Sequence, residues 1–131
     1  MISKRAIISF LVLVGIFVLI SCEKEEGPGG KVEMAIFVKH HAELIPGAVV
    51  YIKYGAKEQP GTDPSDYDDS AVCGTDGHHI GHTHFENLRK GDYYLYSIGY
   101  DSTINEVVRG GVPFEIKVKT GEVTVDVPVT E

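Results

Sequence analysis

Apolar and polar side chains alternate with a period of two over most of the chain beyond residue 30. This period places one set of side chains on one face of an extended strand. In residues 31–41 the apolar set is Val32, Met34, Ile36 and Val38. Five further segments have the same strand-like composition: GAVVYIKYG, HTHF, DYYLYSIGY, VPFEIKVK and EVTVDVPV. No helical period of useful length interrupts them, so the pattern predicts an all-β protein.

Turn-forming pairs separate these segments at fairly even intervals. They are Pro46-Gly47, Pro60-Gly61, Asp76-Gly77, Lys90-Gly91, Gly110-Gly111 and Thr120-Gly121. Several short strands with regularly spaced turns are typical of a β-sandwich. We therefore expect residues 31–131 to form a single antiparallel β-sandwich of about seven strands. The composition, 43% hydrophobic and 24% charged, suits one globular domain of this size.

Residues 1–21 follow a different pattern. Lys4 and Arg5 precede an apolar run from Ala6 to Ile20. This run is shorter than the roughly 20 residues that a membrane-spanning helix needs, and it is typical of a secretory signal peptide. A retained membrane anchor is the alternative interpretation.

The end of the apolar run, Leu19-Ile20-Ser21-Cys22, resembles the lipobox of bacterial lipoproteins. The resemblance implies cleavage before Cys22, whose sulfur and amine then carry acyl chains such as palmitate. Residues 22–30 would form a flexible tether, since EKEEGPGG is acidic and rich in glycine. Lys24-Glu25-Glu26 also resembles the export signal of Bacteroidetes lipoproteins. These features predict lipid anchoring to the outer membrane with display at the cell surface; a periplasm-facing orientation is the alternative.

Charge and cysteine content narrow the possible partners. Loss of the leader removes two of the 12 basic residues and none of the 19 acidic ones. The mature chain then has a net charge of about −9, which argues against nucleic acid or anionic lipid as a partner. With Cys22 lipidated, Cys73 is the sole remaining cysteine and has no intrachain disulfide partner.

Two stretches, IPGAVVYI and GTDGHHIGHTHFENLRKGDYYLYSIGYD, resemble the carboxypeptidase regulatory-like, or transthyretin-like (prealbumin-like), domain. The family pattern has a Pro-Gly turn before an apolar strand, then Thr-Asp, Gly, Phe and Leu, and finally Gly-x-Tyr-x-Leu. The resemblance covers residues 31–129 and implies a prealbumin-like sandwich that acts as a binding or accessory module. His78-His79-Ile80 lengthens the turn beyond the family pattern.

The same stretch carries the candidate metal ligands. His82 and His84 lie two apart on a predicted strand, so both rings project from one face. His78 and His79 in the adjoining turn, and Cys73 before it, could complete a site. Such nitrogen and sulfur ligands suit zinc, copper or nickel. The spacing matches no structural zinc signature, so histidines that are merely polar surface are the alternative.

His40-His41 forms a second histidine pair, at the end of another predicted strand. Adjacent residues of a strand face opposite sides. We therefore expect only one of these two rings to be available to any one site.

A further candidate surface lies on the strand DYYLYSIGY. If Tyr93 and Leu95 point inward, Tyr94, Tyr96 and Tyr100 lie together on the opposite face. An exposed tyrosine strip would suit an envelope protein or a glycan as partner. The alternative is that a loop or a neighbouring strand covers the rings.

The sequence favours a non-catalytic protein. Ser, His and Asp are present, but no nucleophile elbow and no phosphate-binding glycine loop accompanies them. We expect an envelope-anchored lipoprotein that serves as a binding or accessory module for envelope proteins or glycans. A histidine-rich protein that binds zinc, copper or nickel is the alternative.

Overall fold

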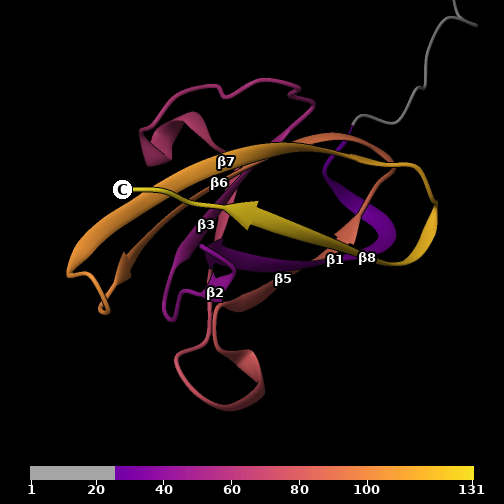
Figure 1. The fold of residues 1–131 in the computed structure, drawn as a ribbon. Helices are drawn as coiled ribbons and strands as arrows, with labels where there is room; N and C mark the ends of the chain where they lie inside the picture. Colours follow the sequence, from indigo (N-terminus) through magenta and orange to yellow (C-terminus); the bar gives the residue numbers. More distant parts are fainter. Residues whose placement is uncertain (1–25) are drawn as a thin grey trace, which may run out of the picture.

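The computed structural model describes residues 26–131, in which two β-sheets pack face to face (Figure 1). The predicted all-β sandwich is confirmed. The predicted signal peptide and the lipidation of Cys22 lie outside the described residues. Among the described residues no helix is long and apolar enough to cross a membrane.

The strands are β1 (Pro28–His40), β2 (Glu43–Leu44), β3 (Val49–Tyr54), β4 (Asp69–Val72), β5 (His82–Leu88), β6 (Gly91–Asp101), β7 (Glu106–Ile116) and β8 (Thr120–Pro128).

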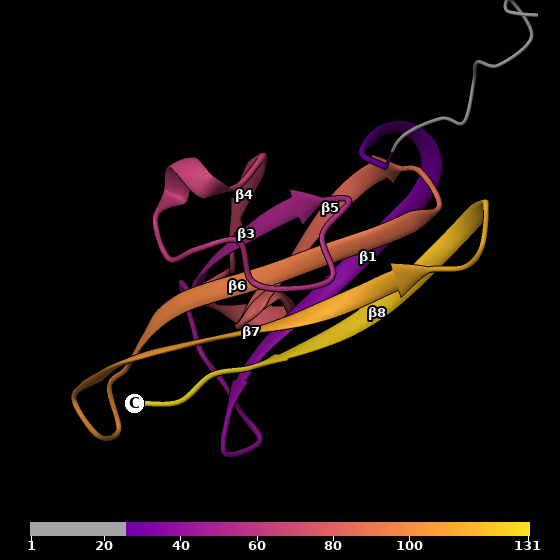
Figure 2. The same ribbon diagram turned by 90° about the horizontal axis from the view of Figure 1, so that it is seen from above.

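Strand β1 organises the first sheet, where it pairs with β2, β5 and β8. The second sheet has the order β4-β3-β6-β7. All pairs are antiparallel except β1 and β8, which run parallel from Lys31–Thr120 to Lys39–Pro128 (Figure 2). This pair differs from the expected purely antiparallel arrangement. The β7–β8 connection carries the chain from one sheet to the other, so β8 enters the first sheet in the direction of β1.

The core lies between the sheets and follows the predicted alternation. The four apolar residues expected on one face of residues 31–41 are all fully buried. They meet side chains of the second sheet, chiefly Val50, Ile52, Tyr93, Leu95, Val108 and Ile116. Burial of one large apolar side chain stabilises the fold by about 1.5–3 kcal/mol. Since the described core draws only on residues 32–129, a chain that starts just after Cys22 keeps it whole.

Gly110-Gly111, expected at a turn, lies inside β7, which begins at Glu106. The turn is residues 102–105 instead. A Cβ atom at Gly110 would lie 2.1 Å from the carbonyl oxygen of Pro128. Glycine is used here because the backbone after β8 approaches β7 closely, which is a common role of glycine in strands.

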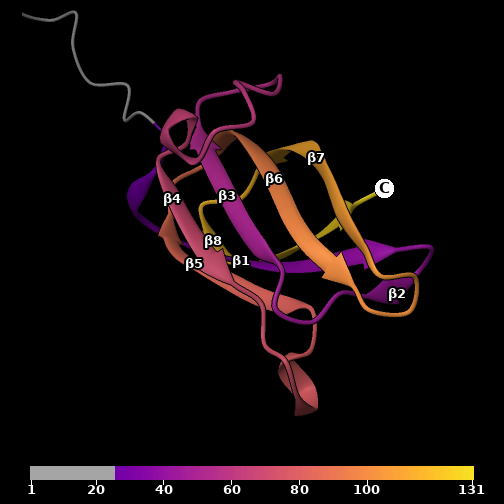
Figure 3. The same cartoon turned by 90° about the vertical axis from the view of Figure 1, so that its left-hand side faces the viewer.

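The sandwich has two distinct ends. We define the tether end as residues 26–30, 88–91 and 117–119, and the distal end as residues 40–43, 73–81, 101–106 and 128–131. Strands β1, β6 and β8 all run from the first to the second, while β5 and β7 return (Figure 3). At the tether end, the backbone N–H of Gly27 donates to the Tyr93 hydroxyl (2.8 Å), and that of Arg89 donates to the Gly27 carbonyl (2.9 Å). The start of the described chain is therefore fixed to the β5–β6 turn.

Candidate metal centre

The predicted histidine site forms a group of stacked rings, here called the His82 stack: Phe37, His79, His82 and His84. Phe37 and His82 are partners in the β1–β5 ladder, and their rings lie parallel with centroids 4.4 Å apart. The His84 ring lies 4.3 Å from that of His82, and the His79 ring lies 6.1 Å from it. The expected projection of His82 and His84 from one face therefore agrees with the structure.

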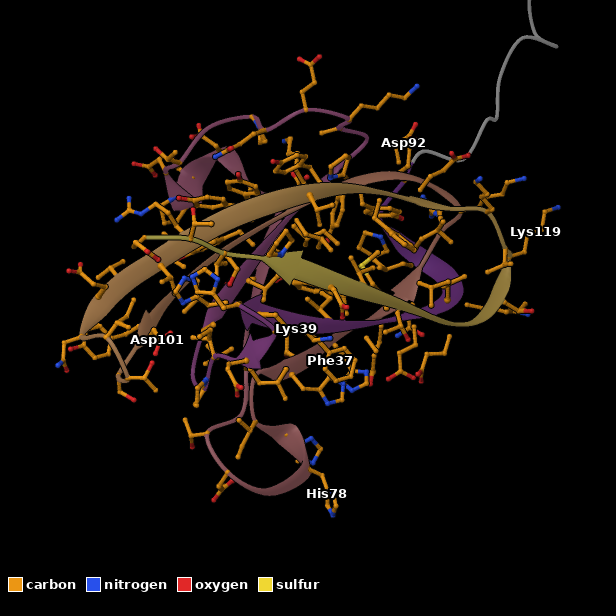
Figure 4. The ribbon with its side chains drawn as sticks, viewed as in Figure 1. Phe37, Lys39, His78, Asp92, Asp101 and Lys119 are labelled. Atoms are coloured by element: carbon orange, nitrogen blue, oxygen red, sulfur yellow. The ribbon has the colours of Figure 1, made fainter. Side chains whose placement is uncertain are left out.

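The nitrogen atoms of the His82 stack do not converge as expected. Neither ring nitrogen of His82 has a hydrogen-bond partner in the described part of the chain. Nδ1 of His84 lies 2.7 Å from a carboxylate oxygen of Glu33. His78 is exposed and projects from the tip of the β4–β5 connection (Figure 4). Within residues 26–131, no three potential ligand atoms of the predicted set approach within 4.8 Å of one another.

Cys73 belongs to the hydrophobic core and is 2% exposed. Burial raises the pKa of its thiol to about 11. Since the thiolate is the form that binds metal, Cys73 is poorly suited to complete a site with the histidines.

A second group of titratable side chains, here called the His40 cluster, gathers at the distal end: His40, His41, Asp101 and Glu131. His40 is 3% exposed, and its Nδ1 lies 2.8 Å from Asp101 Oδ2. Its Nε2 lies 2.7 Å from Glu131 Oε2, but at an angle that makes no hydrogen bond. Within the described residues, His40, His41 and Glu131 are the group whose ligand atoms all lie within 4.8 Å of one another.

The turn between β1 and β2 brings His41 to this group. His41 and Ala42 both have positive φ, 49° and 68°. Two such residues form the two-residue hairpin turn that matches the strand twist, although Asn-Gly is the favoured sequence there. Because His41 has left the strand, its ring lies 4.1 Å from that of His40. The expectation that only one of the two rings could join a site is therefore wrong.

Distant parts of the chain supply the two carboxylates. Asp101 ends β6 and is held by Thr103, whose backbone N–H and hydroxyl both donate to Oδ1 at 2.9 and 2.6 Å. Glu131 follows Thr130, which exchanges two backbone hydrogen bonds with Arg109 of β7. The close approach of the backbone at Gly110 permits this pairing and positions Glu131 beside His40.

The side chains of the His40 cluster shift one another's pKa values toward the charged forms. The hydrogen bond with Asp101 raises the pKa of His40 against the opposing effect of burial, and Glu131 adds to the rise. The donors of Thr103, together with His40, lower the pKa of Asp101 to about 2. The pKa of Glu131 is lowered by its own backbone N–H and by His40. These shifts share one cause, the position of the His40 ring between two carboxylates.

Sequence reasoning missed the His40 cluster because its members lie far apart along the chain. Neither Asp101 nor Glu131 belongs to a recognisable ligand motif. The signal that was available is the His-His pair directly before a two-residue turn, since a turn of this kind returns the second ring toward the first.

The expected exposed tyrosine strip is largely covered. Tyr94 and Tyr96 lie on the outer face of the second sheet, but only 8% and 2% of them is exposed. Tyr67, from the β3–β4 connection, stacks on Tyr96 with ring centroids 5.8 Å apart. Tyr51 packs beside both rings. Tyr100 alone of the three predicted partner residues is exposed, at 51%.

No protein-family model matches the chain, and no curated protein matches it.

Proposed function

We propose that the chain is an envelope-anchored lipoprotein whose sandwich is a non-catalytic binding module. The observation that carries the proposal is the separation of the two ends. The first described residues, which follow the predicted lipid-bearing Cys22 in sequence, lie at the tether end, while the His40 cluster and the β6–β7 turn lie at the distal end (Figures 1 and 4). A lipid at Cys22 would hold the first end near the membrane and present the second to partners.

The charge of the tether end supports this orientation. An open hollow there is lined by Lys31, Arg89, Lys90 and Lys119. With Lys117, five of the ten basic residues that would remain after loss of the leader thus gather where the membrane surface would be. A basic side chain close to an anionic membrane surface contributes about 1 kcal/mol of attraction. The net negative charge of the mature chain argues against anionic lipid as a partner. That argument does not apply to this end of the molecule, where basic side chains gather.

The β6–β7 turn at the distal end offers an apolar contact surface for an envelope protein or a glycan. Its exposed residues are Tyr100, Ile104 and Val107. This surface replaces the covered Tyr94 and Tyr96 in the proposed partner site. Tyr100 is held by a hydrogen bond to Asn105 (3.1 Å), so the ring is presented in an ordered position.

The His40 cluster does not favour catalysis by a nucleophile. In a catalytic triad, the histidine nitrogen opposite the aspartate faces a hydroxyl or thiol. Here that nitrogen faces the carboxylate of Glu131. The arrangement suits binding, and its nitrogen and carboxylate donors suit a metal ion.

The proposal is tested by expressing the full chain in a Bacteroidetes host and feeding an alkyne-tagged fatty acid. We expect label on the wild-type protein and on Cys73→Ser, and none on Cys22→Ser. Protease added to intact cells should then degrade the wild-type protein if the distal end is displayed at the surface. A wild-type protein that takes up no label would contradict the lipoprotein proposal; labelled but protease-resistant protein would indicate the periplasm-facing orientation.

A further inference from the structure

We propose that His40, His41 and Glu131 bind one divalent transition-metal ion, and that Asp101 positions His40 for it. The proposal deepens the proposed function, on which it rests for its place at the distal end, by naming the ligand. Zinc is the ion that two imidazoles and one carboxylate suit best, with copper and nickel as competitors. The hairpin histidines, although more numerous, are not part of this site.

The positions of the donor atoms are close to those that such an ion needs. Zinc–nitrogen and zinc–oxygen bonds of 2.0–2.2 Å in tetrahedral geometry place donor atoms about 3.4 Å apart. The three donor atoms already lie within 4.8 Å of one another. Nε2 of His40 and Oε2 of Glu131, at 2.7 Å, need to separate slightly to admit the ion. His41 is exposed, and the side chain of Glu131 is 54% exposed, so both can make this adjustment.

Asp101 prepares His40 for coordination. Its hydrogen bond to Nδ1 keeps a proton on that nitrogen and leaves Nε2, which lies beside Glu131, as the nitrogen that can bind an ion. A carboxylate behind a ligating histidine is the usual arrangement in metal sites, because it fixes the ring and raises its basicity. Thr103 holds the carboxylate in turn. His40 is thus a buried ligand held by a hydrogen bond, while His41 and Glu131 are open to solvent.

The ion would offset the negative charge of the two carboxylates that lie beside His40. Three protein donors would leave the fourth tetrahedral position to water.

The experiment is zinc titration by calorimetry on the untagged chain from residue 23, which carries no lipid and keeps the whole core. We expect one site of micromolar or tighter affinity. Glu131→Gln and His41→Ala, at exposed positions that the fold does not need, should each weaken binding roughly 10- to 100-fold or more. His40→Ala should abolish it. The matched control, His82→Ala with His84→Ala, should change affinity less than threefold.

Cobalt provides a second readout on the same variants. Tetrahedral cobalt(II) absorbs strongly in the visible range, so the wild-type protein and the hairpin double variant should develop the same band, and Glu131→Gln should not. Loss of binding in the hairpin variant alone, or wild-type affinity no tighter than millimolar, would overturn the proposal. Because the protein is unlipidated, neither outcome depends on whether Cys22 carries lipid, and the fatty-acid label separately decides the anchoring.

Discussion

The two histidine groups differ in what surrounds each ring. The three histidines of the His82 stack lie close in sequence, and their rings lie against one another and against Phe37 of β1. The His40 cluster combines three distant parts of the chain, and its central ring is held by carboxylates on both sides. Stacking presents the faces of rings to each other, whereas carboxylates fix the direction of nitrogen lone pairs. The number of histidines in a segment therefore says less about metal binding than the groups that orient one of them.

Replacing the aspartate behind His40 is the strongest test of this difference. Asp101→Asn keeps the side-chain shape but removes the charge that fixes the Nδ1 proton. We expect zinc affinity to fall about 10- to 100-fold, the usual effect of removing such a partner. Calorimetry on the untagged chain measures it.

The matched change at the other group is Glu33→Gln, which removes the carboxylate beside His84. Zinc affinity should stay within threefold of the wild-type value. Equal losses in the two variants would mean that the two groups do not differ as proposed.

The two histidine groups should also differ in how strongly they make stability and zinc affinity depend on pH. His40 faces Asp101 from β6, His41 from the adjoining turn and Glu131 beyond β8. Its folded-state pKa is raised above 6.5, so its contribution to stability is complete below pH 6.5. That contribution is lost as pH rises through the folded-state value. Asp101, whose pKa is lowered to about 2, contributes above its ordinary value near 4 and loses this contribution as pH falls toward 2.

The metal-free protein should therefore become less stable as pH rises from 6.5 through the folded-state pKa of His40, as measured by urea unfolding. Zinc affinity should rise with pH, because protons compete with the ion for the imidazole nitrogens. The stability trend should vanish in His40→Gln, and both trends should persist in the hairpin double variant. A metal-free stability that climbs with pH in this range would contradict the assigned role of His40.

The smallest expected effect concerns the turn that brings His41 to the cluster. Ala42 is exposed with a φ of 68°, a conformation that glycine adopts without a Cβ clash. Ala42→Gly should raise the free energy of unfolding by roughly 0.5–1 kcal/mol and leave zinc affinity unchanged.

His41→Gly sharpens the same test. It should bring a similar gain in stability but lose zinc affinity, because it relieves the same backbone conformation while removing a ligand. If His41→Gly kept wild-type affinity, His41 would not be a ligand, and the cluster would have only two protein donors.

The fold was predictable where local pattern decides it, and the site was not. The alternation of Val32, Met34, Ile36 and Val38 gave the buried face of β1, and the Pro46-Gly47 pair preceded β3 as expected. Gly110 was misassigned because glycine serves both turns and close backbone approaches, and only the position of Pro128 distinguishes the two. The His40 cluster depends on long-range register in the same way, since its orienting carboxylates lie beyond any local motif.

The parallel pairing of β1 with β8 affects how early the chain can fold. Lys39 and Asp126, which bridge these two strands, stand 87 positions apart. High contact order of this kind slows folding, because β1 gains its β8 neighbour only when nearly all of the domain has been synthesised. If the chain is exported as proposed, this late pairing would help to keep it incompletely folded while it crosses the membrane.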